Sequence, residues 1–543
     1  MTRKIHLVFK THLDIGFTDH AAKVRAQYHE RFIPQAIDTG EHFFAEDPAN
    51  PKFIWTTGAW LIGDHLNSQD GARVKRLERA IERGLITWHA LPFTTHSELM
   101  SPALFRAGLS YSQELDKRFG KSTISSKMTD VPGHTIGIVP LLAEAGVKFL
   151  HLGVNTASPP PDVPDVFRWR APDGSEVVVM YQKSYGETHF PEGFDEGLGF
   201  AHTSDNIGPQ SVPQTVDAHR EIRTRNPGAE IVASTLDDYG KILWARREEF
   251  PIVELELADS WIYGAGSDPT KVKRYLHLQR LYDQFAADNL TPSRLAFGRR
   301  LAMVAEHTWG VDIKSYLRDD TAWDRPAFEA LRSTDHRFLF TEASWAEQRA
   351  YLDAAVAELD PADRMLAEAA EDPAAAGHGW LVETDPLTGD VILIRSPAGV
   401  ELRGEHGSLL GYRYESYDAA DIAAHMDTYL THRLEWAILD HIKPGLDRAT
   451  TARSATFTPQ LIGGVATLDP EAHAQLGAPA EVAYGFRALD DHRLEITVEL
   501  LDKPANRMPE ASFVTFTPAG PHDWQFLKTG QWRAASLVAP KGG

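Results

Sequence analysis

The first half of the chain alternates between short apolar runs and amphipathic stretches. Residues 5–9, 148–154 and 176–181 are rich in strand formers, whereas residues 74–83 and 104–118 have a helical pattern. Such alternation is typical of βα units that surround a parallel sheet. We therefore expect an α/β fold in which polar residues at the carboxyl ends of the strands form the site.

The pattern changes twice in the second half. Helical stretches at residues 268–285 and 344–359 predict a helical bundle, and the second stretch opens with a capping box at residues 344–347. Residues 371–379 combine proline with small residues, which favours a linker. The remaining segments predict an antiparallel β domain with one helical stretch. Its strands are predicted at residues 391–394, 455–457, 481–486 and 494–500, and its helical stretch at 420–442.

Length, charge and cysteine content limit the possible partners. A chain of 543 residues is long enough for about three domains. Its net charge of −21 argues against nucleic acid or an anionic membrane surface as the main partner. Because the chain has no cysteine, histidines and carboxylates would have to hold any metal ion. No signal peptide or membrane span is visible, so we expect a cytoplasmic protein, and a homo-oligomer is compatible with these properties.

His12 and Asp14 follow the first predicted strand. Residues two apart in a strand point to the same side, so this imidazole and this carboxylate can converge on one point. Metal sites need such convergence. A buried histidine bonded to a nearby aspartate has the same spacing, and the pair alone leaves both interpretations open.

Three further positions carry acidic or imidazole groups where apolar runs end. They are Asp130, the pair Asp237 and Asp238, and His307. A zinc site without cysteine takes a mixed set of imidazole and carboxylate ligands, and these positions together with the first pair could supply one. Each position also has a structural interpretation: a helix N-cap at 130, a turn pair at 237–238 and a structural histidine at 307.

In their order and spacing, these motifs resemble those of the class II α-mannosidases (glycoside hydrolase family 38), which are retaining, zinc-dependent enzymes. Residues 11–17 (THLDIGF) are similar to the family's His-x-Asp-Pro-Gly-Trp, and residues 129–135 (TDVPGHT) to its Asp-Pro-Phe-Gly-His-Ser. Residues 236–239 (LDDY) are similar to its Asp-Asp-Phe, and residues 306–308 (EHT) fall where it has His-His-Asp. The resemblance covers roughly residues 1–370 and is strongest to a bacterial branch of the family.

The resemblance implies an architecture and a cofactor. The expected architecture is a catalytic α/β barrel of about seven strands at residues 1–258, a helical bundle at 259–370 that contributes a metal ligand, and a C-terminal antiparallel β domain at 380–543. The expected cofactor is one zinc ion. Its ligands by this resemblance are His12, Asp14, Asp130 and His307. Metal binding and folding would then be coupled, because the ligands come from two domains.

The resemblance also implies residue roles. Asp130 would be the nucleophile as well as a zinc ligand, and Asp238 would be the acid/base, its pKa raised by burial or by the adjacent Asp237. We expect a carbohydrate substrate held by aromatic stacking and by polar contacts. The stacking candidates are Phe17, Trp60 and Trp309, and the polar candidates are Glu98, Asp237 and Glu306.

Two other functions fit the same residues. A zinc-dependent carbohydrate deacetylase also places Asp and His ligands at strand ends, where the metal activates water. A non-catalytic carbohydrate-binding protein would keep the fold without the reaction. The chain also departs from the family pattern at Ile15, Phe17, Glu306 and Thr308. For this reason the resemblance leaves the sugar open.

Overall fold

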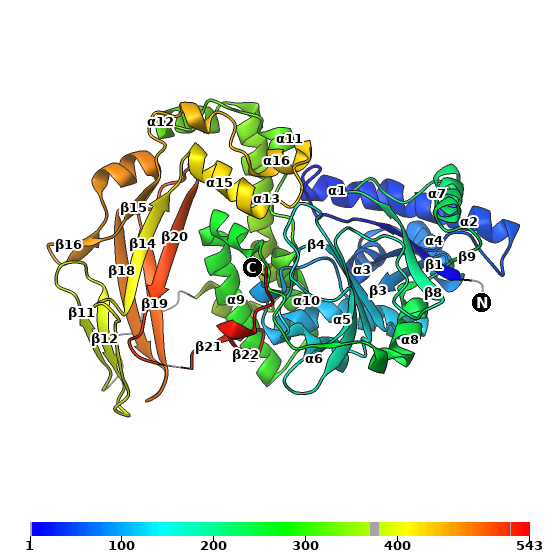
Figure 1. Cartoon of the computed structure of the whole chain (residues 1–543), viewed down its shortest axis with the longest axis horizontal. Coiled ribbons are helices and arrows are strands. Elements are labelled where there is room, and N and C mark those ends of the chain that lie inside the picture. Colours follow the sequence, from blue (N-terminus) through cyan, green and yellow to red (C-terminus); the bar gives the residue numbers. More distant parts are fainter. Residues whose placement is uncertain (1–2, 370–378, 522, 543) are drawn as a thin grey trace. The chain divides into compact units, whose positions relative to one another are not determined.

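The structure is a computed structural model that describes residues 3–369, 379–521 and 523–542 (Figure 1). Its contacts define two compact units. Unit 1 comprises Met1–Asp312, Glu342–Ala367 and Trp524–Gly543, and unit 2 comprises Ile313–Thr341 and Glu368–Asp523. The domain boundaries expected at residues 258, 370 and 380 stay predictions, and the compact units follow other bounds. The predicted linker at 371–379 lies outside the described residues except for Gly379.

Unit 1 is built on two five-stranded sheets. The first has the strand order β3-β2-β1-β8, with β9 paired to the amino-terminal half of β1, and all of these pairs are parallel. The second has the order β10-β6-β7-β5-β4, in which only β6 and β7 are antiparallel. A hydrogen bond of 2.9 Å from Ala90 N to Ser125 O joins the end of β3 to the start of β4.

The α/β class is therefore confirmed, but the closed barrel of about seven strands is not. Among the described residues, the strands of unit 1 form two five-stranded sheets and one two-stranded hairpin rather than one ring. The strands are β1 (Lys4–Thr11), β2 (Trp55–Gly58), β3 (Ile86–His89), β4 (Ser125–Asp130), β5 (Phe149–Val154), β6 (Val166–Arg170), β7 (Glu176–Gln182), β8 (Glu196–Thr203), β9 (Glu230–Ala233), β10 (Ile252–Val253), and the hairpin β21 (Gln525–Lys528) and β22 (Gln531–Ala534).

Unit 1 also contains helices (Figure 1). They are α1 (Ala21–Gln27), α2 (Ile33–Glu46), α3 (Ala59–Ser68), α4 (Gly71–Glu82), α5 (Pro102–Phe119), α6 (Ile138–Glu144), α7 (Val212–Arg225), α8 (Leu236–Ala245), α9 (Pro269–Asp288), α10 (Pro292–Leu301) and α14 (Pro361–Glu368). Of these, α2, α3, α4, α6, α7 and α8 contact the strands. The central strand β1 pairs with β8 along its whole length, with β9 at its amino-terminal half and with β2 near its carboxyl end, and it is buried from residue 5 to residue 11. Burial on both faces explains its continuous apolar pattern.

The helical region departs from one sequence prediction. The predicted helix at 268–285 is α9, and the Asp268 side chain accepts a hydrogen bond from Lys271 N at its start. The capping box predicted at residues 344–347 is wrong, because α13 (His336–Ala357) already begins eight residues before Ser344. The Ser344 hydroxyl instead accepts a hydrogen bond of 3.1 Å from Val311 N, just beyond the predicted ligand His307.

Unit 2 is mainly antiparallel β, as the sequence predicts. One sheet has the order β11-β12-β14-β15 with β13 and β20 at its sides, and a second has the order β16-β17-β18-β19. The strands are β11 (Leu381–Thr384), β12 (Val391–Arg395), β13 (Glu401–Arg403), β14 (Leu410–Ser416), β15 (Ala455–Phe457), β16 (Gln460–Ile462), β17 (Val465–Thr467), β18 (Glu481–Ala488), β19 (Leu494–Leu501) and β20 (Glu510–Phe516). The helices are α11 (Ile313–Tyr316), α12 (Arg325–Arg332), α15 (Ala419–Tyr429) and α16 (Glu435–His441).

In the described ranges, none of the helices has the length and apolarity required to cross a membrane.

Candidate metal centre and active site

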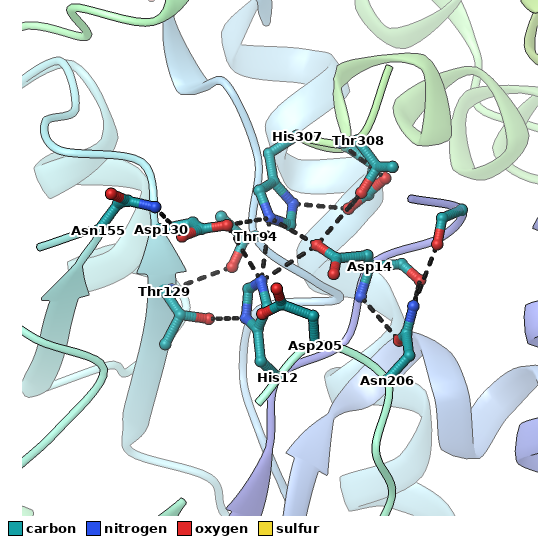
Figure 2. A network of polar contacts seen from close by, with 12 residues as sticks. His12, Asp14, Thr94, Thr129, Asp130, Asn155, Asp205, Asn206, His307 and Thr308 are labelled. Atoms are coloured by element: carbon teal, nitrogen blue, oxygen red, sulfur yellow. Dashed lines mark hydrogen bonds and ion pairs between the residues drawn. The ribbon is translucent and has the colours of Figure 1, made fainter. Parts of the chain in front are cut away.

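The four predicted ligands meet at one point of unit 1 (Figure 2). His12 and Asp14 follow β1, Asp130 ends β4, and His307 follows a short helical turn after α10. His12 is fully buried, and Asp14 and His307 are 3% and 8% exposed. The carboxyl ends of β1 and β4 therefore converge, as expected for parallel strands.

The spacing of the donor atoms fits a tetrahedral metal site. The Nε2 atoms of His12 and His307 are 3.3 Å apart. Each lies 3.1 Å from Asp14 Oδ1 and 3.3–3.4 Å from Asp130 Oδ2. The edge of a regular tetrahedron is about 1.6 times the centre-to-corner distance, so these edges correspond to bonds of about 1.9–2.1 Å, close to zinc–nitrogen and zinc–oxygen bonds. The two nitrogens and two oxygens are thus spaced so that they could hold a metal ion.

The far sides of both imidazoles are held by hydrogen bonds. His12 Nδ1 lies 2.6 Å from Thr129 Oγ1, and His307 Nδ1 lies 2.7 Å from Glu306 Oε1. Such outer partners fix the ring orientation and tautomer of metal-binding histidines. The Glu306 carboxylate also accepts hydrogen bonds from Thr308, so both of its oxygens are engaged behind His307.

The charges of the cluster depend on one another. Burial lowers the pKa of His12, but the carboxylates of Asp14 and Asp130 outweigh it and raise this pKa to about 9. Burial likewise opposes ionisation of Asp130, yet the imidazoles of His12 and His307 hold the pKa of Asp130 well below its usual range. In the absence of a cation, protons on the imidazoles balance the carboxylates. A metal ion would have to displace these protons.

The ligand loops are tied together through the backbone. Phe17 N donates to Gly310 O at 3.0 Å, and Asp312 N donates to Phe17 O at 2.9 Å. Gly310 has φ +111°, and a Cβ atom there would lie 2.6 Å from Trp345, so the turn after His307 needs glycine. These contacts bring the first motif and the His307 segment together.

Asn206 is a structural residue of the site that sequence reasoning missed. Its side-chain amide donates to the carbonyls of Asp14 and Gly16, both at 3.1 Å, and its oxygen accepts from Asp14 N at 3.1 Å. It therefore fixes the loop that presents Asp14. No motif points to it.

Asp130 differs from the other ligands in its backbone conformation and in the contacts of its second carboxylate oxygen. Its φ is +78°, in the left-handed region that aspartate tolerates better than most residues. Oδ2 faces the two histidines, whereas Oδ1 accepts hydrogen bonds from the Tyr185 hydroxyl and, at 3.3 Å, from Asn155 Nδ2. Its side chain is 13% exposed, more than that of Asp14.

Asp205 is a third carboxyl group at the cluster, and sequence reasoning missed it. It lies two residues beyond β8, and Figure 2 shows it beside His12 and Asp14. Burial and the charge of Asp14 raise the pKa of Asp205 to about 6. Nothing in the sequence places Asp205 at a strand end, because the two glycines of β8 interrupt the strand pattern.

The structure does not bring Asp237 and Asp238 to the cluster. Strand β9, which precedes them, pairs with residues Lys4–Leu7 of β1 and so ends well before His12. Asp237 accepts hydrogen bonds from Ile124 N and Ser125 Oγ at the amino end of β4. The half-exposed Asp238 pairs with Lys241 on α8.

The remaining predicted residues differ in their distance from the ligands. Phe17 pairs with the His307 segment, and Trp309 lies against His96 with ring centroids 5.2 Å apart. Glu98 accepts hydrogen bonds from Asp259 N and Lys528. Trp60 is buried and packs on Phe93 in the core, with centroids 6.2 Å apart.

Comparisons with known proteins show distant likenesses. Residues 265–372, about a fifth of the chain, match the protein family described as a domain of unknown function, DUF5054. The search of curated proteins found no match. Among solved structures, an α-mannosidase from Enterococcus faecalis is 14% identical with a TM-score of 0.42, covering 94% of this chain and 56% of that one.

Two other solved structures give similar values. A protein of glycosyl hydrolase family 38 from Enterococcus faecalis is 13% identical with a TM-score of 0.39, covering 95% of this chain and 54% of that one. A 4-α-glucanotransferase from Thermococcus litoralis is 9% identical with a TM-score of 0.36, covering 94% and 98%. This chain thus spans little more than half the length of the two Enterococcus faecalis proteins. At these TM-scores, the function has to be argued from the residues.

Proposed function

We propose that the protein is a zinc-dependent, retaining glycoside hydrolase, with α-mannosides as the first substrates to test. The observation that carries the proposal is the position of Asp130. One of its oxygens completes the donor set, and the other accepts hydrogen bonds from Tyr185 and Asn155 near another carboxyl group, that of Asp205. The motif resemblance to class II α-mannosidases supports the same reaction.

His12, Asp14, Asp130 and His307 would hold the zinc ion. When bound, zinc would supply Lewis-acid stabilisation for sugar hydroxyls and would keep the adjacent carboxylates ionised at neutral pH. The cluster lacks cysteine, and its mixed nitrogen and oxygen donors suit this ion.

Asp130 is the proposed nucleophile and Asp205 the proposed acid/base. Asp130 Oδ1 would form a bond to the anomeric carbon as the glycosidic bond breaks, while the proton on Asp205 passes to the leaving oxygen. Water then attacks the anomeric carbon, returns a proton to Asp205 and releases Asp130. We assign the acid to Asp205 rather than Asp238, since a general acid must reach the reacting bond.

The spacing of the two carboxyl groups supports retention of configuration. The Tyr185 hydroxyl makes a short hydrogen bond to Asp130 Oδ1 and lies 3.5 Å from Asp205 Oδ1. The two oxygens are therefore no more than about 6 Å apart, less than the roughly 6.5–9.5 Å at which inverting enzymes hold their carboxyl groups.

The proposal is tested by trapping the covalent sugar. The chain is loaded with zinc, screened on 4-nitrophenyl glycosides beginning with the α-mannoside, and treated with a fluorinated analogue of the sugar it cleaves. We expect mass spectrometry to find the sugar on the peptide that contains Asp130. A deacetylase would release acetate and leave no adduct, and a binding protein would do neither. Either result contradicts the proposal.

A further inference from the structure

The loop between β7 and β8 carries one side chain that contacts both proposed catalytic carboxyl groups. The Tyr185 hydroxyl donates to Asp130 Oδ1 and lies 3.5 Å from Asp205 Oδ1. The ring lies against His12, with centroids 4.8 Å apart, so the hydroxyl sits at the metal cluster.

A buried lysine, Lys127, holds the backbone of this loop by a hydrogen bond. Lys127 is only 1% exposed, and its Nζ donates to the Tyr185 carbonyl at 2.7 Å. The same Nζ lies 2.8 Å from His151 Nδ1 and 4.4 Å from the centre of the Phe200 ring. Burying an amine costs stability unless its hydrogen bonds are made, and the Tyr185 carbonyl and His151 Nδ1 supply acceptors for Lys127.

The contacts of Lys127 continue into the loop. His151 Nε2 lies 2.8 Å from Gln182 Oε1, which also accepts from Glu187 N at 3.1 Å. Because the glutamine oxygen is an acceptor, His151 carries its proton on Nε2, and its bare Nδ1 accepts from Lys127. Gln182 Nε2 donates back to Glu187 O at 3.1 Å. Hydrogen bonds between Gln182 and Glu187 thus join the residues that flank Tyr185 in the loop.

Glycine at position 153 leaves room for this arrangement. A Cβ atom on Gly153 in β5 would lie 2.7 Å from the Tyr185 carbonyl oxygen, the atom that Lys127 binds. Lys127 also stands three residues before Asp130 on β4. One strand therefore carries the proposed nucleophile and the amine that places its hydrogen-bond donor.

We infer that Tyr185 is a catalytic residue that donates to whichever of Asp130 and Asp205 is charged, and that Lys127 is a positioning residue acting through Tyr185. This inference rests on the proposed function. Before reaction Asp130 is the carboxylate and Asp205 holds the proton. When Asp130 Oδ1 bonds to the anomeric carbon and Asp205 gives its proton to the leaving oxygen, the charge moves to Asp205. The phenolic O–H turns to it without losing its own proton.

The experiment compares Tyr185→Phe, Lys127→Met and the double variant with the wild type on the 4-nitrophenyl glycoside that it cleaves. We expect kcat to fall about 10- to 100-fold in each single variant, with KM and zinc content unchanged. The double variant should be no slower than Tyr185→Phe, because Lys127 acts through the tyrosine. Tyr239→Phe and Lys117→Met, a buried tyrosine and an exposed lysine elsewhere, are the controls.

Full activity of Tyr185→Phe would overturn the inference, and so would losses that multiply in the double variant. If Lys127→Met does not fold, Gly153→Ala replaces it, since a methyl group there displaces the same carbonyl. An active Asp130→Asn protein would defeat the proposed function itself. An inactive Asp130→Asn beside a fully active Tyr185→Phe would defeat only this inference.

Discussion

Two groups of acidic residues follow strands of unit 1, and they have opposite surroundings. At the carboxyl edge, Asp14, Asp130 and Asp205 lie with two imidazoles, and Asp14 is buried and Asp130 partly buried beside them. Near the amino edge, Asp237 accepts hydrogen bonds from the start of β4, and Asp238 pairs with Lys241 in solvent. Both groups look alike as sequence. Strand register decides which of them can do chemistry, because β9 ends at the level of Leu7.

The largest expected difference between the two edges is in activity. Asp130→Asn should lower kcat/KM more than about a thousandfold, since it removes the proposed nucleophile and a metal ligand together. Asp238→Asn should change kcat/KM less than twofold. Initial rates on the 4-nitrophenyl glycoside measure both. Comparable losses in the two variants would erase the distinction.

Asp205→Asn should lower kcat about 10²- to 10⁴-fold, the usual contribution of a general acid. Substrates with very acidic leaving groups should be affected least. Burial and nearby charge raise the pKa of Asp205 to about 6 in the metal-free protein. Because the acid must be protonated, wild-type activity should fall on the alkaline side of its pH profile, and the variant should lack this limb. A pH–rate profile tests this point, and an unchanged limb would assign it to another group.

The same substitution should stabilise the metal-free protein at high pH. The raised pKa means that ionisation of Asp205 costs folding free energy, and this cost grows as the pH rises from about 4 to 6 and is full above pH 6. Asp205→Asn should therefore raise the melting temperature much more at pH 8 than at pH 4. A matched Asp238→Asn protein is the control in the same melting experiment.

Zinc affinity should depend on pH, because the ion must displace protons from the histidines at the carboxyl edge. The pKa of His12 is raised to about 9 in the metal-free protein, so its proton must leave when the ion binds. Below pH 9 the affinity should fall about tenfold per pH unit for each proton released. Calorimetry in buffers of different ionisation enthalpy counts these protons. Zinc binding without proton release would show that the histidines are not ligands.

The smallest effect is expected for Glu306→Gln. This change weakens the hydrogen bond behind His307 without removing a ligand, and should lower zinc affinity about 10- to 100-fold. Asp237→Asn at the amino edge should leave the affinity unchanged. Competition with a zinc chelator measures both.

Much of the fold can be predicted from the sequence, because long apolar runs indicate buried strands. Strand β1 and helix α9 lie where their patterns predict them. Strand β8 was missed because Gly197 and Gly199 interrupt its apolar pattern, and Asp205 and Asn206 were lost with it. The glycines have a reason, since a Cβ at Gly197 would lie 2.8 Å from His189 O.

The site was predictable where two side chains share one strand, as His12 and Asp14 nearly do. It was not predictable where a contact depends on sheet register or on a loop, as for Tyr185 and Lys127. Local periodicity contains no information on which strands become neighbours. That His12 and His307 lie together was predicted from the motif resemblance, because no rule of residue spacing relates two positions so far apart in the chain.

The donor atoms come from three segments that the chain separates widely, and backbone hydrogen bonds already draw two of them together at Phe17 and Gly310. An ion at their centre would act as a cross-link between these segments and would stabilise the folded state. Starving cells of zinc would then reduce more than turnover: the protein itself would become easier to degrade.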